Sequence, residues 1–445
     1  MNIAVVGSGA AGLSSAWLLS QRHDVTLFEA GPTLGGHAHT VDVQVGARTA
    51  CVDTGFIVSN TWTYPNFSAL MDYLDVPMVD TQMSFSVSAD QGRYEYSGGS
   101  LGRLFGSKRQ WLNPTHWRML TDLVHFYRTV EERTKSAPAD ITLGGFLTHE
   151  GYGESFIRHH ILPMAGAIWS STPEQVAAYP LRAFVDFFAN HRLFMLGNRP
   201  DWRTVQGGSR CYVEKLVADA RFEIELCTPI AKIIRYSGGV ELLRSNGRAS
   251  NYDHVVLATH GNQALALLDQ PSPAEQQLLS VFKTSANRVL LHRDLALMPK
   301  ARRFWSAWNY LSSGTGRETK LAVTYWMNAL QKLSSPVDHF VSLNPPVEPD
   351  STLVDGRFIY HHPIFTADTL TAQKQLWSLQ GQQRTWFCGA WFGAGFHEDA
   401  MQAGLAVAEE LGGVRRPWRV NGESSRIHVQ PKWDEALASF AEAAE

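Results

Sequence analysis

Three closely spaced glycines near the start of the chain are arranged to bind phosphate groups. Gly7, Gly9 and Gly12 form the sequence G-S-G-A-A-G between an apolar run and a run of helical composition. The first glycine permits a tight turn, and the second lets the backbone approach a pyrophosphate. The third lets a helix that begins at Ala10 and Ala11 pack closely on the strand, with its N-terminal amides directed at the negative charge. This spacing predicts a dinucleotide-binding turn in a βαβ unit.

An acidic residue and a glycine pair follow the turn and indicate which dinucleotide binds there. Residues 24–29 (D-V-T-L-F-E) form a second predicted strand that ends in Glu29, whose carboxylate can accept hydrogen bonds from the ribose of an adenosine. Gly35 and Gly36 come soon afterwards. A chain that passes close to the second phosphate and ribityl of an extended FAD needs such a pair, whereas a plain NAD domain does not. An ordinary loop is the alternative explanation of the pair.

Longer motifs resemble those of one flavoprotein superfamily. The glycine turn, Glu29, the Gly35-Gly36 pair and a glycine-rich segment from Thr385 are similar to those of the two-domain flavoproteins that include monoamine oxidases, protoporphyrinogen oxidase and the phytoene desaturases. More narrowly, about residues 1–415 resemble the NAD/FAD-binding flavoproteins associated with cyclopropane-fatty-acid synthases, which are similar to the N-terminal module of plant cyclopropane synthases. The segments that carry this narrower resemblance include LGGHAHT, DTGFIVSNTWTYPNF, WSSTPEQV, VQGGSRCYVEKL, YHHPIF and WFCGAWFGAGFHEDA.

The resemblance implies a set of FAD-binding residues in the first two thirds of the chain. The glycine turn would hold the pyrophosphate and Glu29 the adenosine ribose, while Gly35, Gly36 and His37 would lie by the second phosphate and the ribityl chain. His37 stands where amine oxidases commonly have an arginine. The other implied contacts are Thr54, Gly55 and Phe56 in the flavin pocket, Ile230 beside the adenine, and Ala258 and Thr259 near it.

The resemblance also assigns the C-terminal glycine-rich segment to the flavin. Gly389 would approach the phosphates, and the acidic residue that usually follows is replaced by Trp391, so its role is absent or is taken by Glu398 or Asp399. Ala400 and Met401 would begin a helix whose positive end stabilises the anionic reduced flavin. Phe396, Asp399 and Ala400 are therefore expected in the FAD site. The FAD is expected to be non-covalent, because Cys388 is more typical of a buried small hydrophobe than of a covalent anchor.

Histidine and glutamate side chains are the candidates for proton transfer. We expect His361 and His362 to face the flavin and move protons, with Glu398 as a further acid or base. Tyr360 and His397 are additional candidates. The alternative for each histidine of the pair is a hydrogen-bonded core residue, and for His397 and Glu398 it is a structural cap at a helix start. Trp169, Trp391 and Phe392 are expected to wall a slot for a lipid-like substrate, with core packing as their alternative.

The overall composition argues against several other classes of protein. A net charge of −3 and a pI near 6.6 give no reason to expect a nucleic-acid partner. The four cysteines are scattered without metal-type spacing, which favours a reducing compartment and predicts neither a disulfide framework nor a metal site. We expect a cytoplasmic protein, because the chain shows no signal peptide and no apolar run of the ~20 residues that cross a bilayer.

The elements that must position these residues alternate along the chain between two kinds of sequence. This pattern predicts an α/β fold in which a Rossmann-like FAD-binding domain is interleaved with an α+β substrate domain, as in monoamine oxidases. Residues 1–75, 205–284 and 376–415 are assigned to the FAD-binding domain. Residues 76–204 and 285–375 are assigned to the substrate domain or cap, and residues 416–445 to a tail that ends in a helix.

Together these features predict an FAD-dependent oxidoreductase. The expected substrate is an unsaturated, methylated or cyclopropane fatty acyl chain, carried in a phospholipid, and the expected reaction is hydride abstraction that gives desaturation or oxygen insertion. The alternatives are a flavin amine oxidase, a fatty-acid double-bond isomerase, and a non-catalytic flavin module that partners a methyltransferase of the cyclopropane-fatty-acid-synthase type.

A basic and aromatic stretch is a candidate for peripheral contact with the inner face of the membrane. The segment SLGRLFGSKRQWLNPTHWRML combines Arg103, Lys108, Arg109 and Arg118 with leucine, phenylalanine and tryptophan. The hypothesis is an interfacial patch that reaches acyl chains in a bilayer. The alternative is a solvated basic face over an ordinary helical cap.

Overall fold

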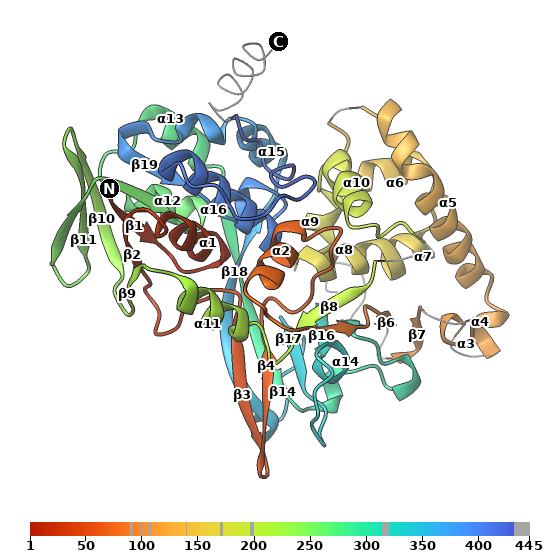
Figure 1. Ribbon diagram of the computed structural model, residues 1–445. Helices are drawn as coiled ribbons and strands as arrows, with labels where there is room; N and C mark the ends of the chain where they lie inside the picture. The colour runs from red at the N-terminus through yellow and green to blue at the C-terminus, as the bar shows by residue number, and fades with distance from the viewer. Residues whose placement is uncertain are drawn as a thin grey trace.

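The protein has a mixed α/β fold with two large sheets, as the sequence predicts. The computed structural model describes residues 1–89, 92–98, 101–105, 108–138, 140–169, 172–195, 200–313 and 320–430. In Figure 1 a parallel sheet and its helices occupy the left of the view, and a layer of helices lies on the right. Among the described residues, no helix combines the length and the apolar character that crossing a membrane requires.

A five-stranded parallel sheet carries the predicted phosphate-binding turn, and its strand order is β19-β13-β1-β2-β9. Its strands come from distant parts of the chain, and most residues of β1, β2, β13 and β19 are buried. Helix α1 contacts β1 and β2, and strands of a three-stranded sheet contact β1 and β13. The predicted βαβ unit is confirmed, and its helix α1 is Ala10–Leu19. The strands are β1 (Asn2–Val6), β2 (Asp24–Phe28), β9 (Glu223–Glu225), β13 (His254–Leu257) and β19 (Thr385–Phe387).

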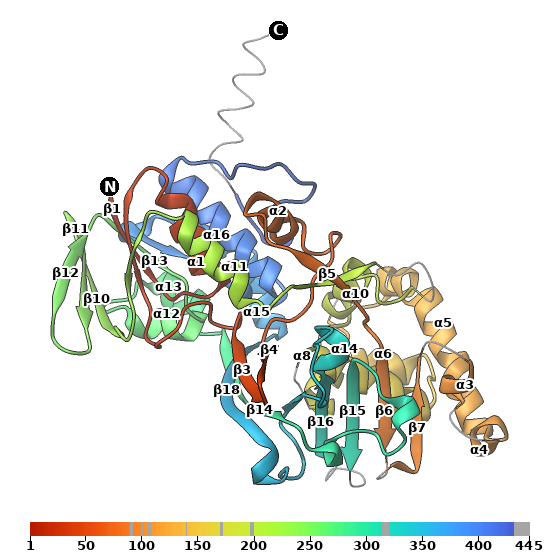
Figure 2. The ribbon, with the colours of Figure 1, turned by 60° about the horizontal axis from the view of Figure 1, so that its bottom comes forward.

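Helix α16 (His397–Gly412) lies beside α1, as Figures 1 and 2 both show. The two helices approach closely because Gly404 has no side chain: a Cβ there would lie 2.3 Å from the carbonyl oxygen of Ala11. Every residue of α1 is buried. The other helices of this half are α2 (Pro65–Tyr73), α11 (Arg210–Asp219), α12 (Gly261–Leu267), α13 (Pro273–Leu279) and α15 (Ala367–Gln373).

Smaller sheets flank the parallel sheet. The first is an antiparallel three-stranded sheet, and the second is a hairpin that leads from the glycine pair toward the other half of the molecule. Their strands are β10 (Ile230–Tyr236), β11 (Gly239–Arg244) and β12 (Ala249–Tyr252), and the hairpin strands β3 (Thr40–Val45) and β4 (Arg48–Asp53). A further two-stranded sheet pairs β5 (Met78–Thr81) with β8 (Trp202–Val205).

A seven-stranded sheet dominates the second half, in the order β18-β14-β17-β16-β15-β6-β7. Several of its strands run side by side in the lower part of Figure 2. Its longest strand, β18, lies at one edge and pairs with β14 in an antiparallel register. The strands are β6 (Phe85–Ala89), β7 (Tyr94–Ser97), β14 (Lys283–His292), β15 (Trp308–Ser313), β16 (Lys320–Trp326), β17 (Phe340–Leu343) and β18 (Val354–Ile364).

A layer of helices shares one hydrophobic core with this sheet. Its longest helix, α5 (Pro114–Ser136), begins where Asn113 accepts a hydrogen bond from the backbone of Thr115 and proline occupies the first helical position. The other helices are α3 (Leu101–Leu104), α4 (Lys108–Trp111), α6 (Leu143–His149), α7 (Glu154–Phe156), α8 (Leu162–Trp169), α9 (Pro173–Ala177), α10 (Leu181–Asn190) and α14 (Met327–Leu330).

The segment after α16 crosses back over the first half of the molecule. Trp418 stacks on Trp17 of α1, with ring centroids 5.8 Å apart. The guanidinium of Arg416 is buried and donates to both oxygens of Glu409, at 2.7 and 2.9 Å, and to Asn66. Residues 416–430 form turns and irregular segments, and the predicted terminal helix falls in residues 431–445, outside the described part of the chain.

Replacing Arg416 tests how far this segment supports the fold. Arg416→Met leaves Glu409 without its buried partner, so the free energy of unfolding should fall by about 3–5 kcal/mol in urea titrations. Arg415→Met is the matched control, because Arg415 also pairs with Glu409 but its side chain is 52% exposed against 0% for Arg416. The control should cost less than about 1 kcal/mol. Equal losses for the two variants would contradict a role for the buried pair.

Candidate functional site

The N-terminal glycine turn has open space at Gly9, where a phosphate would approach, and close backbone contacts at Gly7 and Gly12, where the helix packs on the sheet. A Cβ on Gly12 would lie 1.8 Å from the carbonyl oxygen of Gly7, so the helix can approach the strand only with glycine there. A Cβ on Gly7 would lie 2.9 Å from the carbonyl oxygen of Ala258. By contrast, a Cβ on Gly9 would meet nothing within 4 Å. The backbone of Gly9 therefore remains accessible to a ligand, as the pyrophosphate role requires.

The glycine pair lies directly against this turn. The backbone NH of Gly35 donates to the carbonyl of Ser8 at 3.0 Å, and a Cβ on Gly36 would lie 3.0 Å from the Cα of Gly9. Both glycines of the pair have left-handed φ angles, +111° and +57°, which other residues rarely adopt. The structure therefore brings together two glycine segments that the sequence separates by more than twenty residues.

Glu29 is held at the mouth of the turn. Its carboxylate accepts hydrogen bonds from the backbone and the hydroxyl of Ser8, at 3.0 and 2.5 Å, and from the backbone of Gly31 at 2.8 Å. Thr228 donates its backbone NH to the carbonyl of Glu29, which places the start of β10, and with it Ile230, beside this loop. The predicted adenosine contacts therefore lie in one region.

The C-terminal glycine segment joins the same region. A Cβ on Gly389 would lie 2.5 Å from Nε1 of Trp391, and that indole donates to the carbonyl of Thr259 at 3.0 Å. Thr259 follows Ala258, whose backbone NH donates to the carbonyl of Val6. Gly7, Ala258 and Gly389 thus lie at the ends of neighbouring parallel strands, the usual place for a dinucleotide in such sheets.

Trp391 and Phe392 lie in the core of the first half of the molecule. Both are buried, and the Trp391 ring packs on Phe282 with centroids 4.8 Å apart. This placement corresponds to core packing, the alternative to a wall of the substrate slot. Cys388 is likewise buried in this core, and burial raises the pKa of its thiol to about 12.

The helix after this segment starts three residues earlier than predicted. The backbone NH of Ala400 already donates to the carbonyl of Phe396, so Ala400 lies within the first turn. Asp399 fixes this start because its carboxylate accepts the backbone NH of Phe396 at 2.7 Å. The expectation that the helix begins at Ala400 and Met401 is therefore wrong. The amides without an intrahelical partner belong to the turn that starts at His397.

Glu398 and Asp399 both serve the fold. The Glu398 carboxylate is fully buried and accepts hydrogen bonds from the backbones of Asn66 and Phe67, at 3.1 and 3.0 Å, so it caps α2 rather than its own helix. Asp399 is also buried and pairs with Arg426 at 2.8 Å. This arrangement favours a structural role for Glu398 over the predicted acid or base, and it engages both carboxylates with groups of the protein.

A buried carboxylate fixes the segment that was expected to enter the flavin pocket. Asp53 accepts hydrogen bonds from the Thr40 hydroxyl at 2.6 Å, from the backbone and hydroxyl of Ser209 at 2.9 and 2.8 Å, and from the Gln331 amide at 2.8 Å. Its own backbone NH donates to Gln331. Burial raises the pKa of Asp53 to about 6. The carboxylate therefore joins β3, the loop before α11 and the end of α14.

The residues after Asp53 cross the segment that carries His37. The backbone NH of Phe56 donates to the carbonyl of His37 at 2.7 Å, and a Cβ on Gly55 would lie 2.3 Å from that oxygen. The Phe56 ring stacks on His397 with centroids 3.9 Å apart. His397 also contacts the Tyr212 hydroxyl at 2.7 Å, and burial lowers its pKa to about 3, which is typical of a packed histidine.

Three polar side chains form a closed set of hydrogen bonds at the crossing. The Tyr360 hydroxyl lies 2.8 Å from Nδ1 of His39 and 2.6 Å from the Thr54 hydroxyl. Nδ1 of His39 and the Thr54 hydroxyl are themselves 2.9 Å apart. The His37 ring lies beside them, with its centroid 5.0 Å from that of Tyr360. His39 was not among the site residues predicted from the sequence. Its contact with Tyr360 joins residues 321 positions apart, so no local pattern pointed to it.

His362 joins this set, but His361 does not. Successive residues of a strand point to opposite faces, and the His362 ring lies 5.4 Å from that of His37 whereas His361 is exposed on the other side. His362 therefore lies on the face of β18 that carries Tyr360, and the expectation that His361 also faces the flavin stays a prediction. Asn287, on the neighbouring strand and also missed, donates its amide to Nδ1 of His362 at 3.2 Å. Only the pairing register, Tyr360 with Asn287, shows this contact.

The hydrogen bonds of Asn287 determine which nitrogen of His362 carries the proton. The same amide nitrogen donates to the carbonyl of Ser285, and the amide oxygen accepts from Asn344, so the orientation of the amide is fixed. Nδ1 of His362 is then an acceptor. In the neutral ring the proton must lie on Nε2, which makes His362 a hydrogen-bond donor at that atom.

The polar groups of this cluster are uncharged near neutral pH. Burial lowers the pKa of His37 to about 3, with a further contribution from His362, and burial lowers the pKa of His362 to about 4. The pKa of Tyr360 is raised to about 12, mainly by burial. We name these side chains, together with His39 and Thr54, the polar cluster.

The residues present fit an extended dinucleotide. Gly9 is open on the side away from the sheet, and the left-handed glycine pair passes next to it. Nε2 of His37 is buried and has no hydrogen-bond partner in the protein. A buried polar atom without a partner is costly, so a ligand group that bonds to His37 is expected between the glycine turn and the polar cluster.

An aromatic wall leads from the helical layer to the start of α16. Trp169 of α8 packs on Phe187 of α10 with centroids 4.8 Å apart, and Phe187 stacks on Phe396 at the same distance. Trp169 also stacks on Tyr179, at 4.8 Å. The second hydrophobic core includes Tyr360 and Phe396 at its margin, so this wall and the polar cluster border the same core.

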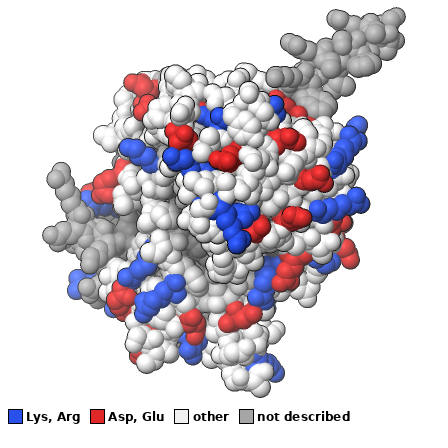
Figure 3. Space-filling view, turned by 90° about the vertical axis from the view of Figure 1, so that its left-hand side faces the viewer, with Lys and Arg blue, Asp and Glu red and all other residues white. Residues whose placement is uncertain are grey.

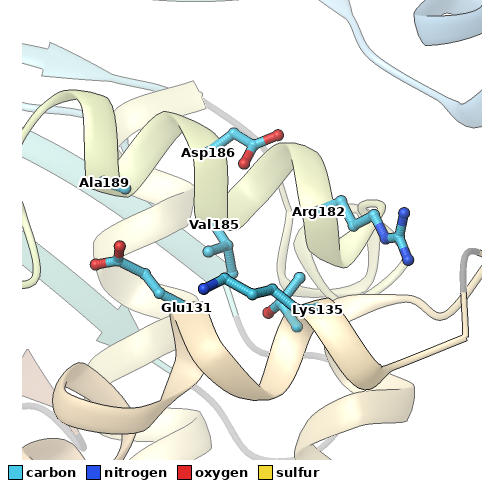
Figure 4. Close-up of a pocket in the computed structure, with 7 residues that line it drawn as sticks. Glu131, Lys135, Arg182, Val185, Asp186 and Ala189 are labelled. Atoms are coloured by element: carbon cyan, nitrogen blue, oxygen red, sulfur yellow. The ribbon is translucent and has the colours of Figure 1, made fainter.

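A hollow between α5 and α10 lies apart from these residues. Figure 4 shows Glu131 and Lys135 on one side of it and Arg182 and Asp186 on the other. Opposite charges alternate around it, as on an ordinary solvated surface. None of the predicted site residues lines this hollow.

On the face that Figure 3 shows, positive and negative side chains are interspersed. Within the described ranges, no group of three or more histidine, cysteine, aspartate or glutamate side chains could hold a metal ion.

Comparisons with known proteins place the chain among flavoproteins. The model of one family, described as flavin containing amine oxidoreductase, matches residues 10–292, more than half of the chain. No curated protein matches the sequence of this chain.

Solved structures share the fold at low sequence identity. Cyclohexylamine oxidase from Brevibacterium oxydans IH-35A is 14% identical, with a TM-score of 0.66 over 92% of this chain and 99% of that one. Putrescine oxidase bound to putrescine is 12% identical, with a TM-score of 0.66 over 92% and 99%. A CLA-producing fatty acid isomerase from P. acnes is 16% identical, with a TM-score of 0.63 over 92% and 97%. Identities this low establish a common fold.

Two glycine substitutions separate ligand binding from folding. Gly9→Ala places a methyl group in open space on the ligand side, so the free energy of unfolding of the apoprotein should stay within about 0.5 kcal/mol of wild type. FAD affinity, measured by quenching of flavin fluorescence, should fall roughly tenfold or more, because the phosphate can no longer approach the backbone.

Gly12→Ala is the comparison, because its Cβ would collide with the carbonyl of Gly7. It should destabilise the apoprotein itself by more than about 2 kcal/mol. Undiminished FAD binding by Gly9→Ala would contradict the assignment of the open side of Gly9 to the ligand.

Proposed function

The chain belongs to the flavin-containing amine oxidoreductase family, and from this premise we propose that it is an FAD-dependent oxidoreductase of fatty acyl chains. The proposed substrates are unsaturated, methylated or cyclopropane acyl chains carried in phospholipids. The proposed reaction removes a hydride equivalent and a proton from adjacent carbons, which gives desaturation. Oxygen insertion is the variant in which molecular oxygen is the co-substrate.

The three glycine segments are the proposed binding site of the cofactor. Gly7, Gly9 and Gly12 would hold the pyrophosphate and Glu29 the adenosine ribose, while His37 would bond to the ligand through its unpartnered Nε2. FAD, when bound, supplies the redox chemistry by accepting the hydrogen and both electrons of a substrate C–H bond. The protein supplies binding, orientation and proton transfer.

The observation that carries the proposal is an aromatic wall that borders the same hydrophobic core as polar groups that are uncharged at neutral pH. Trp169, Phe187 and Phe396 offer apolar surface, and burial keeps His37 and His362 in their neutral forms. Such a site favours an apolar chain, because an unpaired charge would lose its hydration there without compensation.

The polar cluster can move one proton. The Tyr360 hydroxyl stays protonated because its pKa is about 12, and it lies 2.8 Å from Nδ1 of His39. We propose that a substrate proton passes to the Tyr360 oxygen as Tyr360 gives its own proton to His39. His362 donates through Nε2 and orients the reacting groups, because Asn287 occupies its other nitrogen. Thr54 holds the Tyr360 hydroxyl in place.

An amine substrate is less well supported by the carboxylates near the site. A protonated amine is stabilised by an anionic partner, and Asp53, Glu398 and Asp399 are all buried and bonded within the protein. Two structural neighbours are named as oxidases of amines. Another is named as a fatty acid isomerase, which supports the use of this fold on acyl chains.

A methyltransferase of the cyclopropane-fatty-acid-synthase type is the proposed functional partner. The narrow resemblance of segments such as YHHPIF to flavoproteins associated with those synthases supports this pairing. In chemical terms, a reaction that methylates a double bond would supply the branched or cyclopropane chain that this protein then oxidises.

The proposal is tested by anaerobic mixing of the FAD-loaded protein with phospholipids that carry unsaturated or cyclopropane acyl chains. Flavin absorbance should bleach, and mass spectrometry should find acyl chains that have lost two hydrogens. Bleaching by putrescine or cyclohexylamine but not by lipid would overturn the proposal in favour of an amine oxidase. Products with rearranged double bonds, formed without bleaching of the flavin absorbance, would overturn the proposal in favour of an isomerase.

Substitution of the two adjacent histidines tests the polar cluster. His362→Ala should slow flavin reduction about 100-fold, because a donor next to the reacting groups is lost. His361→Ala is the matched control on the opposite face of β18 and should stay within about twofold of wild type. FAD content, read from the ratio of flavin to protein absorbance, should be unchanged in both variants.

The pH profile provides an independent readout of the same residue. The pKa of His362 is about 4, so the ring is neutral at pH 8 and remains so as the pH falls to about 5. His362 should therefore contribute no inflection over this range and should lower the rate of flavin reduction only as the pH approaches 4. An inflection near pH 6 from protonation of Asp53 should persist in His362→Ala. A histidine inflection near pH 6.5 in wild type that disappears in His362→Ala would show that His362 acts as a charged acid instead.

A further inference from the structure

Three large apolar side chains are exposed together where α4 meets α5. Leu112 is 86% exposed, Trp111 48% and Trp117 44%. Trp111 stacks on buried Phe105 with centroids 3.9 Å apart, and the indole of Trp117 donates to the carbonyl of Trp111 at 2.8 Å. The two exposed indoles are thus held in place, and their centroids lie 6.1 Å apart. We name Trp111, Leu112 and Trp117 the aromatic tip.

The aromatic tip lies at an extremity of the molecule. In Figures 1 and 2, α3 and α4 lie at the outer end of the helical layer, on the side away from the parallel sheet. The turn between Trp111 and Pro114 is short, because Asn113 caps α5 directly. Leu112 is therefore presented at a rigid turn rather than on the broad face of a helix.

The surrounding chain is cationic. Between Glu95 and Asp122 the sequence contains Arg103, Lys108, Arg109 and Arg118 and no acidic residue. Asp122 pairs with Arg118 at 3.0 Å. Its carboxylate also accepts a hydrogen bond from the backbone NH of Gly153, and it lies on the buried side of α5. The guanidinium of Arg118 and the side chain of Arg103 are exposed. The stretch that carries the aromatic tip therefore has an excess of positive charge.

We propose that the aromatic tip docks on the surface of an anionic phospholipid bilayer. Tryptophan rings favour the headgroup level because they combine an apolar body with a polar NH, and leucine adds apolar surface that enters the acyl boundary. The cations complement the negative lipid headgroups. The docking surface is independent of the reaction, and it holds even if the substrate is not a lipid.

The size of the aromatic tip favours a membrane over a protein partner. A stable protein interface covers about 800 Å² on each partner, which needs a broad face. Three side chains at a protruding turn are too few for that. They are sufficient for shallow insertion to a depth of about 5–10 Å, which is where interfacial segments bind.

The test is co-sedimentation of the FAD-loaded protein with vesicles of phosphatidylcholine, with and without phosphatidylglycerol. Wild type should sediment with the anionic vesicles, and added salt should weaken the binding because it screens the charges. Leu112→Glu should bind the anionic vesicles roughly tenfold more weakly or worse. Ile359→Glu is the matched control, because Ile359 is 64% exposed on β18, at the opposite edge of the seven-stranded sheet from β7, which α3 contacts. This variant should bind as wild type does.

Two results would overturn the docking surface. One is wild-type protein that stays in the supernatant with anionic vesicles, and the other is Leu112→Glu that binds as tightly as wild type. A lipid-free dimer that Leu112→Glu dissociates, without any vesicle binding, would assign the tip to a protein contact instead. Flavin reduction by detergent-dispersed lipid is measured separately, so failure of the docking surface and failure of the proposed reaction are distinguishable.

Discussion

The buried carboxylate of Asp53 is the constraint on which the arrangement of the polar cluster depends. The carboxylate is buried away from water, so its oxygens need hydrogen-bond donors from the protein. The donors are the Thr40 hydroxyl, Ser209 and Gln331, which come from three separate segments of the chain. These bonds fix the end of β4. The next residue, Thr54, then holds the Tyr360 hydroxyl at 2.6 Å. A charge buried for structural reasons thereby sets the position of uncharged groups that can take part in chemistry.

The same division of roles applies to the other acids near the site. Glu398 caps α2, and Asp399 caps α16 and pairs with Arg426, so carboxylates hold the backbone in place. The groups left to face the proposed ligand are neutral imidazoles and a phenol, next to an aromatic wall. Burial causes both results, because it forces charges to find partners within the protein and keeps unpaired histidines unprotonated.

Sequence patterns predicted local features well and side-chain contacts less well. The strand, turn, helix and second strand around Gly7–Gly12 could be predicted because each depends on near neighbours. The start of α16 was misplaced because the Asp399 cap competes with the expected first turn at Ala400. The expectation for the His361-His362 pair did not take account of the strand conformation, which turns adjacent residues to opposite faces. Asn287 was missed because only strand pairing brings it to His362.

The sequence by itself determined the dinucleotide turn, the flavoprotein resemblance and the mixed α/β class, since these follow from glycine spacing and from the periodicity of apolar residues. The tertiary structure alone decided which polar groups meet. His39, Thr54, Tyr360, His362 and Asn287 come from segments up to 323 positions apart in the 445-residue chain. Their contacts depend on how β3, β4, β14 and β18 pack, and their charge states depend on how deeply that packing buries them. No local pattern encodes either quantity.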